Sequence, residues 1–266
     1  MKKTLLSILW ISIAVALAAG LFFARKYYNE KPCTKLNIKI YYDQGEKKTD
    51  VFLTYEDIRK FIRHSFDSIV GRPMGSISVE ELEHKAEKIP YVLEADAFKS
   101  INGEVTLNIR QRRAIVLVID QENKKYYIDE TGEVIPPRPG FPADILVCNG
   151  NIPHYKFYGE NQNAAFKDSI MQHSILGDIY TLARKLDANP FLHQEITQLY
   201  VTPKGEFYMV PLVGRHKILL GSIDNVDEKL ENLEEFYKQA KKFDAWGKYK
   251  IINLKYKNQI VCTKYY

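Results

Sequence analysis

The most strongly patterned segment of the chain is a run of twenty residues without a charge, LLSILWISIAVALAAGLFFA, at positions 5–24. A helix that rises about 1.5 Å per residue would carry this run across a hydrocarbon core of about 30 Å. Basic residues stand on both sides, so charge alone sets the orientation weakly, but the tail at 1–4 is too short to be a domain. We predict a cytoplasmic tail at 1–4, a transmembrane helix at 5–24 and a juxtamembrane linker at 25–35.

A cleaved signal peptide is the alternative interpretation of the same run. The triplet Ala16-Leu17-Ala18 fits a small-residue cleavage site. The hydrophobic run nevertheless continues through Phe22 and Phe23, whereas a cleaved signal normally ends at its small residues. A retained anchor that contacts membrane lipid through residues 5–24 is therefore favoured, with mild attraction of the following basic residues to anionic lipid. In both cases the body of the protein is exported.

The hydrophobic pattern of residues 36–113 predicts a small α+β unit. Positions 36–42 alternate like a strand. Two amphipathic helices follow, the first capped by Thr54 with Asp57 and the second by the pair Ser78 and Glu81. Two alternating runs then flank the dipeptide Asn102-Gly103, which favours a hairpin with a type I′ turn. The helices should cover one face of a three-stranded sheet.

From residue 114 the pattern changes to short strands, which predicts a second domain at 114–266. This domain should be a mixed β domain with flanking helices. The expected strands are AIVLVI, YYIDETGEVIP with a tight turn at 129–132, DILVC, and the segments 196–201, 206–210 and 217–221. Helices are expected at 166–186 and after Asn225, and a terminal hairpin should turn near Lys257-Asn258.

Composition and motifs exclude several classes of function but do not identify one. Lys and Arg number 38 against 33 Asp and Glu, and the net charge of +5 is spread along the chain, which argues against nucleic acid as a partner. The cysteines, Cys33, Cys148 and Cys262, are too widely spaced for a metal motif. Cys148 and Cys262 lie in strand patterns, where buried free thiols are favoured over a bridge. No nucleophile, phosphate-binding or metal signature is found, so no catalytic residue, cofactor or metal is predicted.

One group of acidic residues keeps an enzymatic alternative open. Asp129 and Glu130 occupy the expected tight turn, and Asp144 lies in a later loop. Turn formation is the ordinary explanation for the pair. An exported enzyme that acts on the cell wall or on an oligosaccharide would instead need these carboxyl groups to converge across a cleft, about 5 to 10 Å apart.

Several motifs, taken together in order, resemble the FtsQ/DivIB family of bacterial cell-division proteins. The stretch SISVEELEHKAEKIPYVLEADAFKSINGEVTLNIRQRRAIVLV looks like the end of a POTRA domain. YYIDETGEVIP, LLGSIDNVDEKLENLEEFY and INLKYKNQIVCTK are similar to later parts of the family. The resemblance implies a POTRA domain at 36–113 and a β domain at 114–266, held at the inner membrane by one N-terminal helix.

The resemblance also implies a function and a site. Members of the family are non-catalytic scaffolds of the division septum, with FtsB and FtsL as main partners and FtsK and the septal peptidoglycan synthase machinery nearby. Their partner site lies on the last strands of the β domain. Carried onto this chain, the expected partner-binding residues are Leu254, Lys255, Tyr256, Gln259, Ile260, Val261, Cys262, Thr263 and Lys264.

Lys255 stands where the family commonly has arginine, and a lysine cannot form the same planar bidentate contact with a carboxylate. A last strand also exposes unpaired backbone groups, which a partner segment can complete by β-addition. On this basis a proline at Val261 is predicted to remove one ladder donor and to abolish co-purification of the partner, while the anchor and the first domain stay intact. A third possible function class is a POTRA-type chaperone of exported proteins. A separate alternative concerns the outer strand of the POTRA-like unit: it serves either as a second docking surface or only as part of a spacer between the membrane and the β domain.

Overall fold

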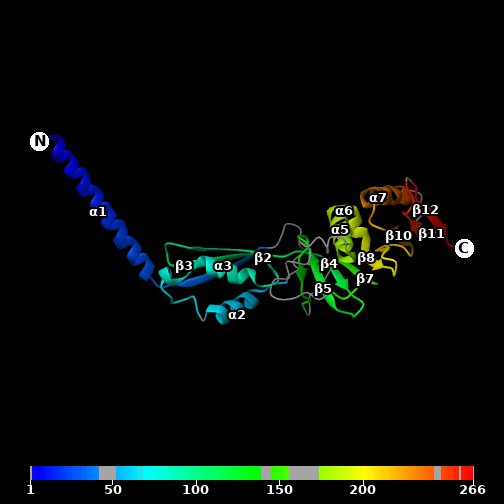
Figure 1. Cartoon of the computed structure of the whole chain (residues 1–266), viewed down its shortest axis with the longest axis horizontal. Helices are drawn as coiled ribbons and strands as arrows, with labels where there is room; N and C mark the ends of the chain where they lie inside the picture. The colour runs from blue at the N-terminus through cyan, green and yellow to red at the C-terminus, as the bar shows by residue number, and fades with distance from the viewer. Residues whose placement is uncertain are drawn as a thin grey trace. The chain divides into compact units, whose positions relative to one another are not determined.

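The computed structural model describes residues 2–41, 52–66, 68–138, 145–155, 174–242, 247–257 and 259–265 (Figure 1). Within these residues the chain forms two compact units, the first ending at Gln111 and the second beginning at Arg112. Asp144, the polar loop through Gly45 and Asn258 of the expected terminal turn lie outside the described residues.

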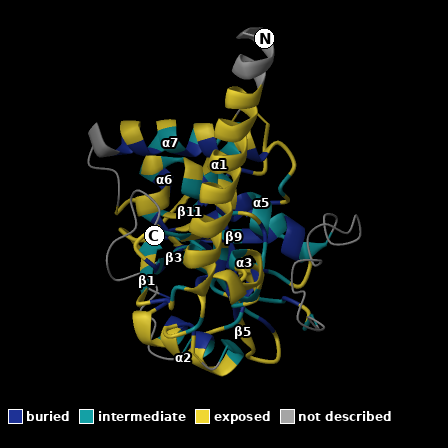
Figure 2. Ribbon diagram, turned by 90° about the vertical axis from the view of Figure 1, so that its left-hand side faces the viewer, coloured by how far each residue is buried: buried dark blue, intermediate teal, exposed yellow. Residues whose placement is uncertain are grey.

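The first element of the first unit is the long helix α1 (Lys2–Glu30). Its segment Ile8–Glu30 has a mean hydropathy of 2.1, and among the described residues it is the helix long and apolar enough to cross a membrane. From Ile8 to Tyr27 the apolar side chains of α1 are exposed, as the yellow ribbon of Figure 2 shows. The helix continues six residues past the expected span, so positions 25–30 of the expected linker are helical. Pro32 then pairs with Pro73 in an isolated β-bridge.

The rest of the first unit is a three-stranded sheet with two helices on one face. Its elements are β1 (Lys35–Tyr41), α2 (Tyr55–Phe66), the 3-10 helix η1 (Met74–Ser76), α3 (Val79–Glu87), β2 (Val92–Lys99) and β3 (Glu104–Gln111). The strand order is β1-β3-β2, with β1 parallel and β2 antiparallel to β3. The predicted α+β layout is confirmed: Ile58 and Leu82 of the helices are buried with Leu107 of the central strand in one core.

The helix starts of this unit follow the predicted capping chemistry with one difference. Thr54 and Asp57 hold each other reciprocally, because the Thr54 amide donates to the Asp57 carboxylate at 2.8 Å and the Asp57 amide to the Thr54 hydroxyl at 3.3 Å. At α3, the Glu81 amide donates to the Ser78 hydroxyl, as predicted. The Glu81 side chain, however, forms an ion pair with Lys85 instead of returning to the cap.

The predicted type I′ turn between β2 and β3 is wrong. That turn needs a positive φ at both central residues, and only Gly103, with φ of 89°, has one; Asn102 does not. The Gly103 amide donates to the Ser100 carbonyl at 3.0 Å and the Ser100 amide to the Glu104 carbonyl at 2.8 Å. This is a longer hairpin loop that closes on a left-handed glycine.

The second unit is built on a nine-stranded sheet of order β12-β11-β10-β9-β8-β7-β4-β5-β6. The bounds are β4 (Ala114–Ile119), β5 (Lys125–Asp129), β6 (Val134–Ile135), β7 (Leu146–Gly150), β8 (Ile196–Val201), β9 (Phe207–Pro211), β10 (Lys217–Gly221), β11 (Tyr249–Asn253) and β12 (Val261–Lys264). The turn at 129–132 forms as predicted, with the Gly132 amide donating to the Asp129 carbonyl at 3.0 Å.

Three helices, α5 (Ile175–Ala188), α6 (Pro190–Glu195) and α7 (Val226–Lys242), pack on one core with this sheet. The first eight residues of the helix expected at 166–186 lie outside the described residues. Helix α6 was not predicted from the sequence. Its start is capped by the Asn189 side chain, which accepts from the amides of Phe191 and Leu192 at 3.0 Å each. Asn225 has φ of 53°, which differs from the extended conformation of an N-cap.

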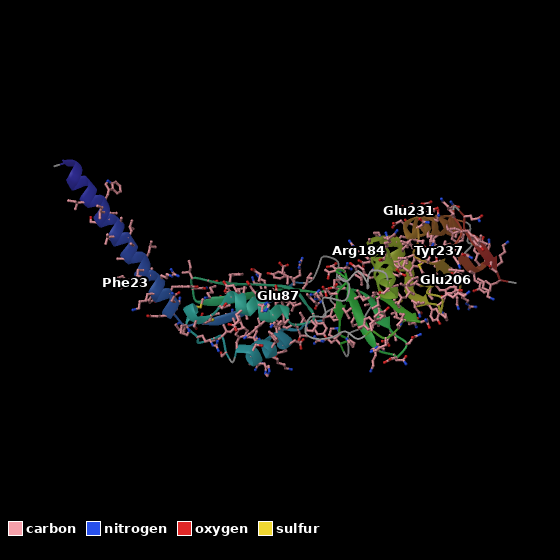
Figure 3. All side chains as sticks on the ribbon, in the orientation of Figure 1. Phe23, Glu87, Arg184, Glu206, Glu231 and Tyr237 are labelled. Carbon is pink, nitrogen blue, oxygen red and sulfur yellow. The ribbon has the colours of Figure 1, made fainter. Side chains whose placement is uncertain are left out.

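One row of side chains across the sheet shows which face is buried. The strand registers align Cys148 of β7 with Leu199, Met209, Ile218, Ile252 and Cys262 of the following strands in the sheet. All of these side chains belong to the core except Cys262, which packs on it from the edge. From α7, the buried Tyr237 points into this core, whereas Glu231 lies on the outer surface of the same helix (Figure 3).

Gly150, at the end of β7, is the glycine with the tightest surroundings in this sheet. Its φ is 111°, and a Cβ built there would lie 2.3 Å from the carbonyl oxygen of Val201 on β8. Because this oxygen belongs to the backbone of β8, it cannot move away without breaking the hydrogen bonds between β7 and β8. We expect Gly150→Ala to lower the free energy of unfolding by roughly 2–4 kcal/mol. Urea titration of the full chain in detergent checks this; Gly205→Ala, which meets nothing within 4 Å, is the control for positive φ alone.

Candidate partner-binding edge

The outermost strand of the large sheet, within the described part of the chain, is β12. It pairs antiparallel with β11 on one side, with Val261 opposite Asn253 and Thr263 opposite Ile251. Its second side is the margin of the sheet. The strand is short and carries exposed side chains at Val261, Thr263 and Lys264.

The direction of the backbone groups in β12 follows from two hydrogen bonds beside it. The Leu254 amide donates to the Leu219 carbonyl of β10 at 2.9 Å, so Asn253 and Ile251, one and three residues away, direct their groups to β12. The Tyr265 amide donates to the Lys248 carbonyl at 3.3 Å, on the β11 side. Because directions alternate along a strand, Val261 and Thr263 bond to β11. Cys262 and Lys264 direct their N–H and C=O groups outward.

The alternation changes one expectation from the sequence. A proline at Val261 would remove a hydrogen bond to β11, within the sheet, rather than a donor offered to a partner. The donors of the margin belong to Cys262 and Lys264.

The structure separates the nine predicted site residues into three groups. Leu254 is 3% exposed and belongs to the core. Ile260 and Cys262 are half-buried and pack on that core, and burial raises the pKa of the Cys262 thiol. The exposed members are Lys255, Tyr256, Gln259, Val261, Thr263 and Lys264.

Lys255 is already paired within the unit. Its ammonium group donates to the carboxylate of Glu206, in the turn between β8 and β9, and this hydrogen bond raises the pKa of Lys255 (Figure 3 labels Glu206). Its aliphatic stem lies over Gly221, where a Cβ would come within 2.8 Å of Lys255 Cγ. Lys255 therefore joins the end of β11 to neighbouring strands, and a partner carboxylate would have to compete with Glu206.

The sheet face opposite the helices was not predicted from the sequence. A second row, one residue along from the buried one, aligns Tyr200, Tyr208, Leu219, Asn253 and Val261 across five strands. Tyr200 and Val261 are each 42% exposed. A third row contains Val210 and Ile251, both half-buried. The signal was present as apolar residues at the outward positions of strands whose inward positions are also apolar. The margin thus adjoins a mixed sheet face, on which these apolar side chains lie beside polar ones such as Gln198, Lys217 and Asn253.

The two acidic residues of the enzymatic alternative have structural partners. The Asp129 side chain is 1% exposed and pairs with Arg112, with Nη1 and Oδ2 2.7 Å apart. Glu130 pairs with Arg113, which also binds Asp187 through two hydrogen bonds of 2.9 and 2.7 Å. Asp144 is outside the described residues. These contacts account for Asp129 and Glu130 without a catalytic role.

The three cysteines are free thiols, and the sheet keeps two of them apart. Cys148 on β7 and Cys262 on β12 are five strands apart in the sheet order. At about 4.8 Å per strand their Cα atoms are roughly 24 Å apart, far beyond the 7 Å that a disulfide spans. Among the described residues no group of three or more His, Cys, Asp or Glu side chains could hold a metal ion.

The fold and the anchor define a class: a protein with one N-terminal membrane-spanning helix, a POTRA-like unit and a β domain ending in an open strand. Comparison with protein families agrees. Residues 31–110 match the model of the POTRA-like domain, and residues 114–263, more than half of the chain, match the model described as FtsQ/DivIB, C-terminal related. The chain therefore belongs to the FtsQ/DivIB family. No curated protein matches it closely enough to add a relative.

Family membership gives the general function. The chain is a single-pass inner-membrane protein of bacterial cell division, in a family of non-catalytic scaffolds that work through other division proteins.

Proposed function

We propose that this protein docks a division protein of FtsB or FtsL type by β-addition to the β12 margin. Its N-terminus lies in the cytoplasm, its two units lie in the periplasm, and it acts at the division septum. FtsK and the septal peptidoglycan synthase machinery are further members of the same assembly. The observation that carries the proposal is the outermost position of β12, with the backbone groups of Cys262 and Lys264 directed away from the sheet.

The energetics assign separate roles to backbone and side chains. A backbone hydrogen bond contributes only about 0.5–1.5 kcal/mol net, and a four-residue strand offers few of them. Apolar contacts must supply the remaining affinity and the choice of partner. A strand added beside β12 would place alternate side chains next to Val261 and Thr263 on the open sheet face. That face, with Leu219 and Tyr208 in the same row, supports the proposal.

A photo-crosslinking amino acid placed at Thr263 of the full-length chain in dividing cells tests the proposal. Thr263 is exposed and lies on the margin strand, so we expect a strong adduct that contains a division protein of FtsB or FtsL type. The matched control is Thr197, which is also exposed but lies on the interior strand β8, four strands from the margin. Position 197 should give little or no such adduct.

The identity of the crosslinked molecules distinguishes the three function classes. Secretory clients at position 263 would favour a chaperone, and wall fragments would favour an enzyme. Equal adducts at positions 197 and 263, or none at 263, would contradict docking at the margin.

A further inference from the structure

The end of α1 is fastened directly to the POTRA-like unit. The Tyr28 hydroxyl donates to the Ser100 carbonyl at 3.3 Å, and the Met74 amide to the Lys31 carbonyl at 2.8 Å. A Cβ built on Gly75 would lie 2.9 Å from Asn29 Cβ, so η1 lies directly against the last turn of the helix. The β2–β3 loop is held as well, because the Thr34 amide donates to the Gly103 carbonyl at 2.8 Å. These contacts tie the loop to the point where the chain leaves α1.

Two apolar side chains flank that point and are left exposed. Ile101, at the tip of the β2–β3 loop, is 89% exposed, the highest value among the large apolar residues that the structure describes. Val70, in the loop before η1, is 50% exposed. The Gly71 amide beside it donates to the Cys33 carbonyl at 2.8 Å, which keeps this loop against the same segment. We name Ile101, Val70 and the intervening residues 31–34 the anchor-proximal tip.

The length of α1 sets the level of this tip relative to a bilayer. The uncharged run ends at Ala24, and Tyr28 is four residues further, about 6 Å along the helix. A headgroup layer extends roughly 5–8 Å beyond the hydrocarbon core on each side. Tyr28 and the loop bonded to it therefore lie at headgroup depth, where tyrosine is enriched. This placement holds for either orientation of the helix.

Charge at the tip fits the same environment. Arg25, Lys26, Lys31 and Lys35 stand close to the end of the helix. Two carboxylates lie near them: Glu30, which is paired with Lys26 at 4.0 Å, and Glu104, which lies opposite Lys35 in the β1–β3 pairing. Among these six residues the cations therefore outnumber the anions. The Lys31 ammonium also donates to the Ile101 carbonyl at 3.4 Å, so cation and apolar tip occupy one place. Cations beside an exposed apolar side chain suit an anionic headgroup layer, which attracts the charge and accepts the side chain.

We propose that the anchor-proximal tip is a lipid-contacting surface: Ile101 and Val70 enter the headgroup layer of the bilayer that α1 spans. The contact holds the POTRA-like unit against the membrane, in addition to its covalent tether. The proposed occupant is anionic lipid in the leaflet on the same side of the membrane as the POTRA-like unit. This proposal rests on α1 as a membrane span and is independent of the partner at β12.

Depth-dependent quenching in anionic nanodiscs tests the proposal with the full-length chain. An environment-sensitive fluorophore is attached to Ile101→Cys in a Cys262→Ser background, since the two remaining cysteines are buried. Lipid with a nitroxide on its headgroup should quench this label several-fold more strongly than the same label at Tyr41→Cys. Tyr41 is 48% exposed and lies at the other end of β1, about 20 Å along the strand from Lys35.

A second variant separates the native side chain from the affinity of the label itself. With the fluorophore at Val70→Cys, Ile101→Asp should weaken headgroup quenching, because a charged tip leaves the layer. The same Ile101→Asp change should not affect a label at Tyr41→Cys. The proposal is overturned if labels at positions 101 and 41 are quenched equally by lipid and equally by aqueous iodide, or if Ile101→Asp leaves the Val70 label unchanged.

Discussion

Asp129→Ala is expected to destabilise the second unit by about 3–5 kcal/mol, the usual cost of removing one partner of a buried ion pair. Arg112, whose side chain is 11% exposed, would keep its charge without the carboxylate that neutralises it. The other carboxylate oxygen of Asp129 accepts from the Thr131 amide at 2.8 Å, the Thr131 hydroxyl at 2.7 Å and the Glu133 amide at 2.8 Å. The alanine substitution therefore also removes the three side-chain hydrogen bonds that stabilise the β5–β6 turn.

Urea unfolding of the full chain in detergent measures the loss, and hydrogen exchange at the β5–β6 turn localises it. The matched control is Glu130→Ala in the next position. Its partner Arg113 retains the two hydrogen bonds to Asp187, so the cost should fall to about 0.5–1.5 kcal/mol. An Asp129→Ala protein as stable as the parent, or equal losses at the two positions, would contradict the structural role of this aspartate.

The sequence predicted elements with strong periodicity and missed those that depend on tertiary contacts. The three strands and two helices of the first unit were predictable because their apolar positions recur at two or three to four residues. The parallel pairing of β1 with β3 has no local signal, since it joins segments nearly seventy residues apart. Helix α6 has only six residues, too few for a periodic pattern, and its Asn189 cap and Pro190 were the available clues.

The candidate site was predictable as a segment but not as a surface. Alternation in the last eighteen residues marks two strands, yet their order in the sheet decides which strand is outermost. Likewise, the row from Tyr200 to Val261 exists only once five strands are aligned. The direction of each backbone group in β12 depends on hydrogen bonds to β11. For this reason the sequence assigned a margin donor to Val261, whereas the structure assigns the donors to Cys262 and Lys264.

Lys264→Pro is expected to weaken capture of the division partner by the full-length chain by roughly tenfold or more. The exchange removes the outward N–H of residue 264 and fixes its φ, while the hydrogen bonds of Val261 and Thr263 to β11 remain. Proline is tolerated on a margin strand when its missing donor faces solvent, so the sheet should stay folded. A strand added beside β12 would lose one of its few backbone bonds and meet the proline ring. Co-purification from cross-linked membranes measures the loss.

Two control variants test whether the loss of capture in Lys264→Pro is due to the backbone N–H. Lys264→Ala removes the same charge and stem but keeps the N–H, so it should retain most of the capture and change mainly its salt dependence. Thr263→Pro deletes a bond to β11 instead, so it should lower the stability of the β11–β12 pair, visible as faster hydrogen exchange there. Equal loss of capture in Lys264→Pro and Lys264→Ala would assign recognition to the lysine charge, and undiminished capture in Lys264→Pro would rule out β-addition at this margin.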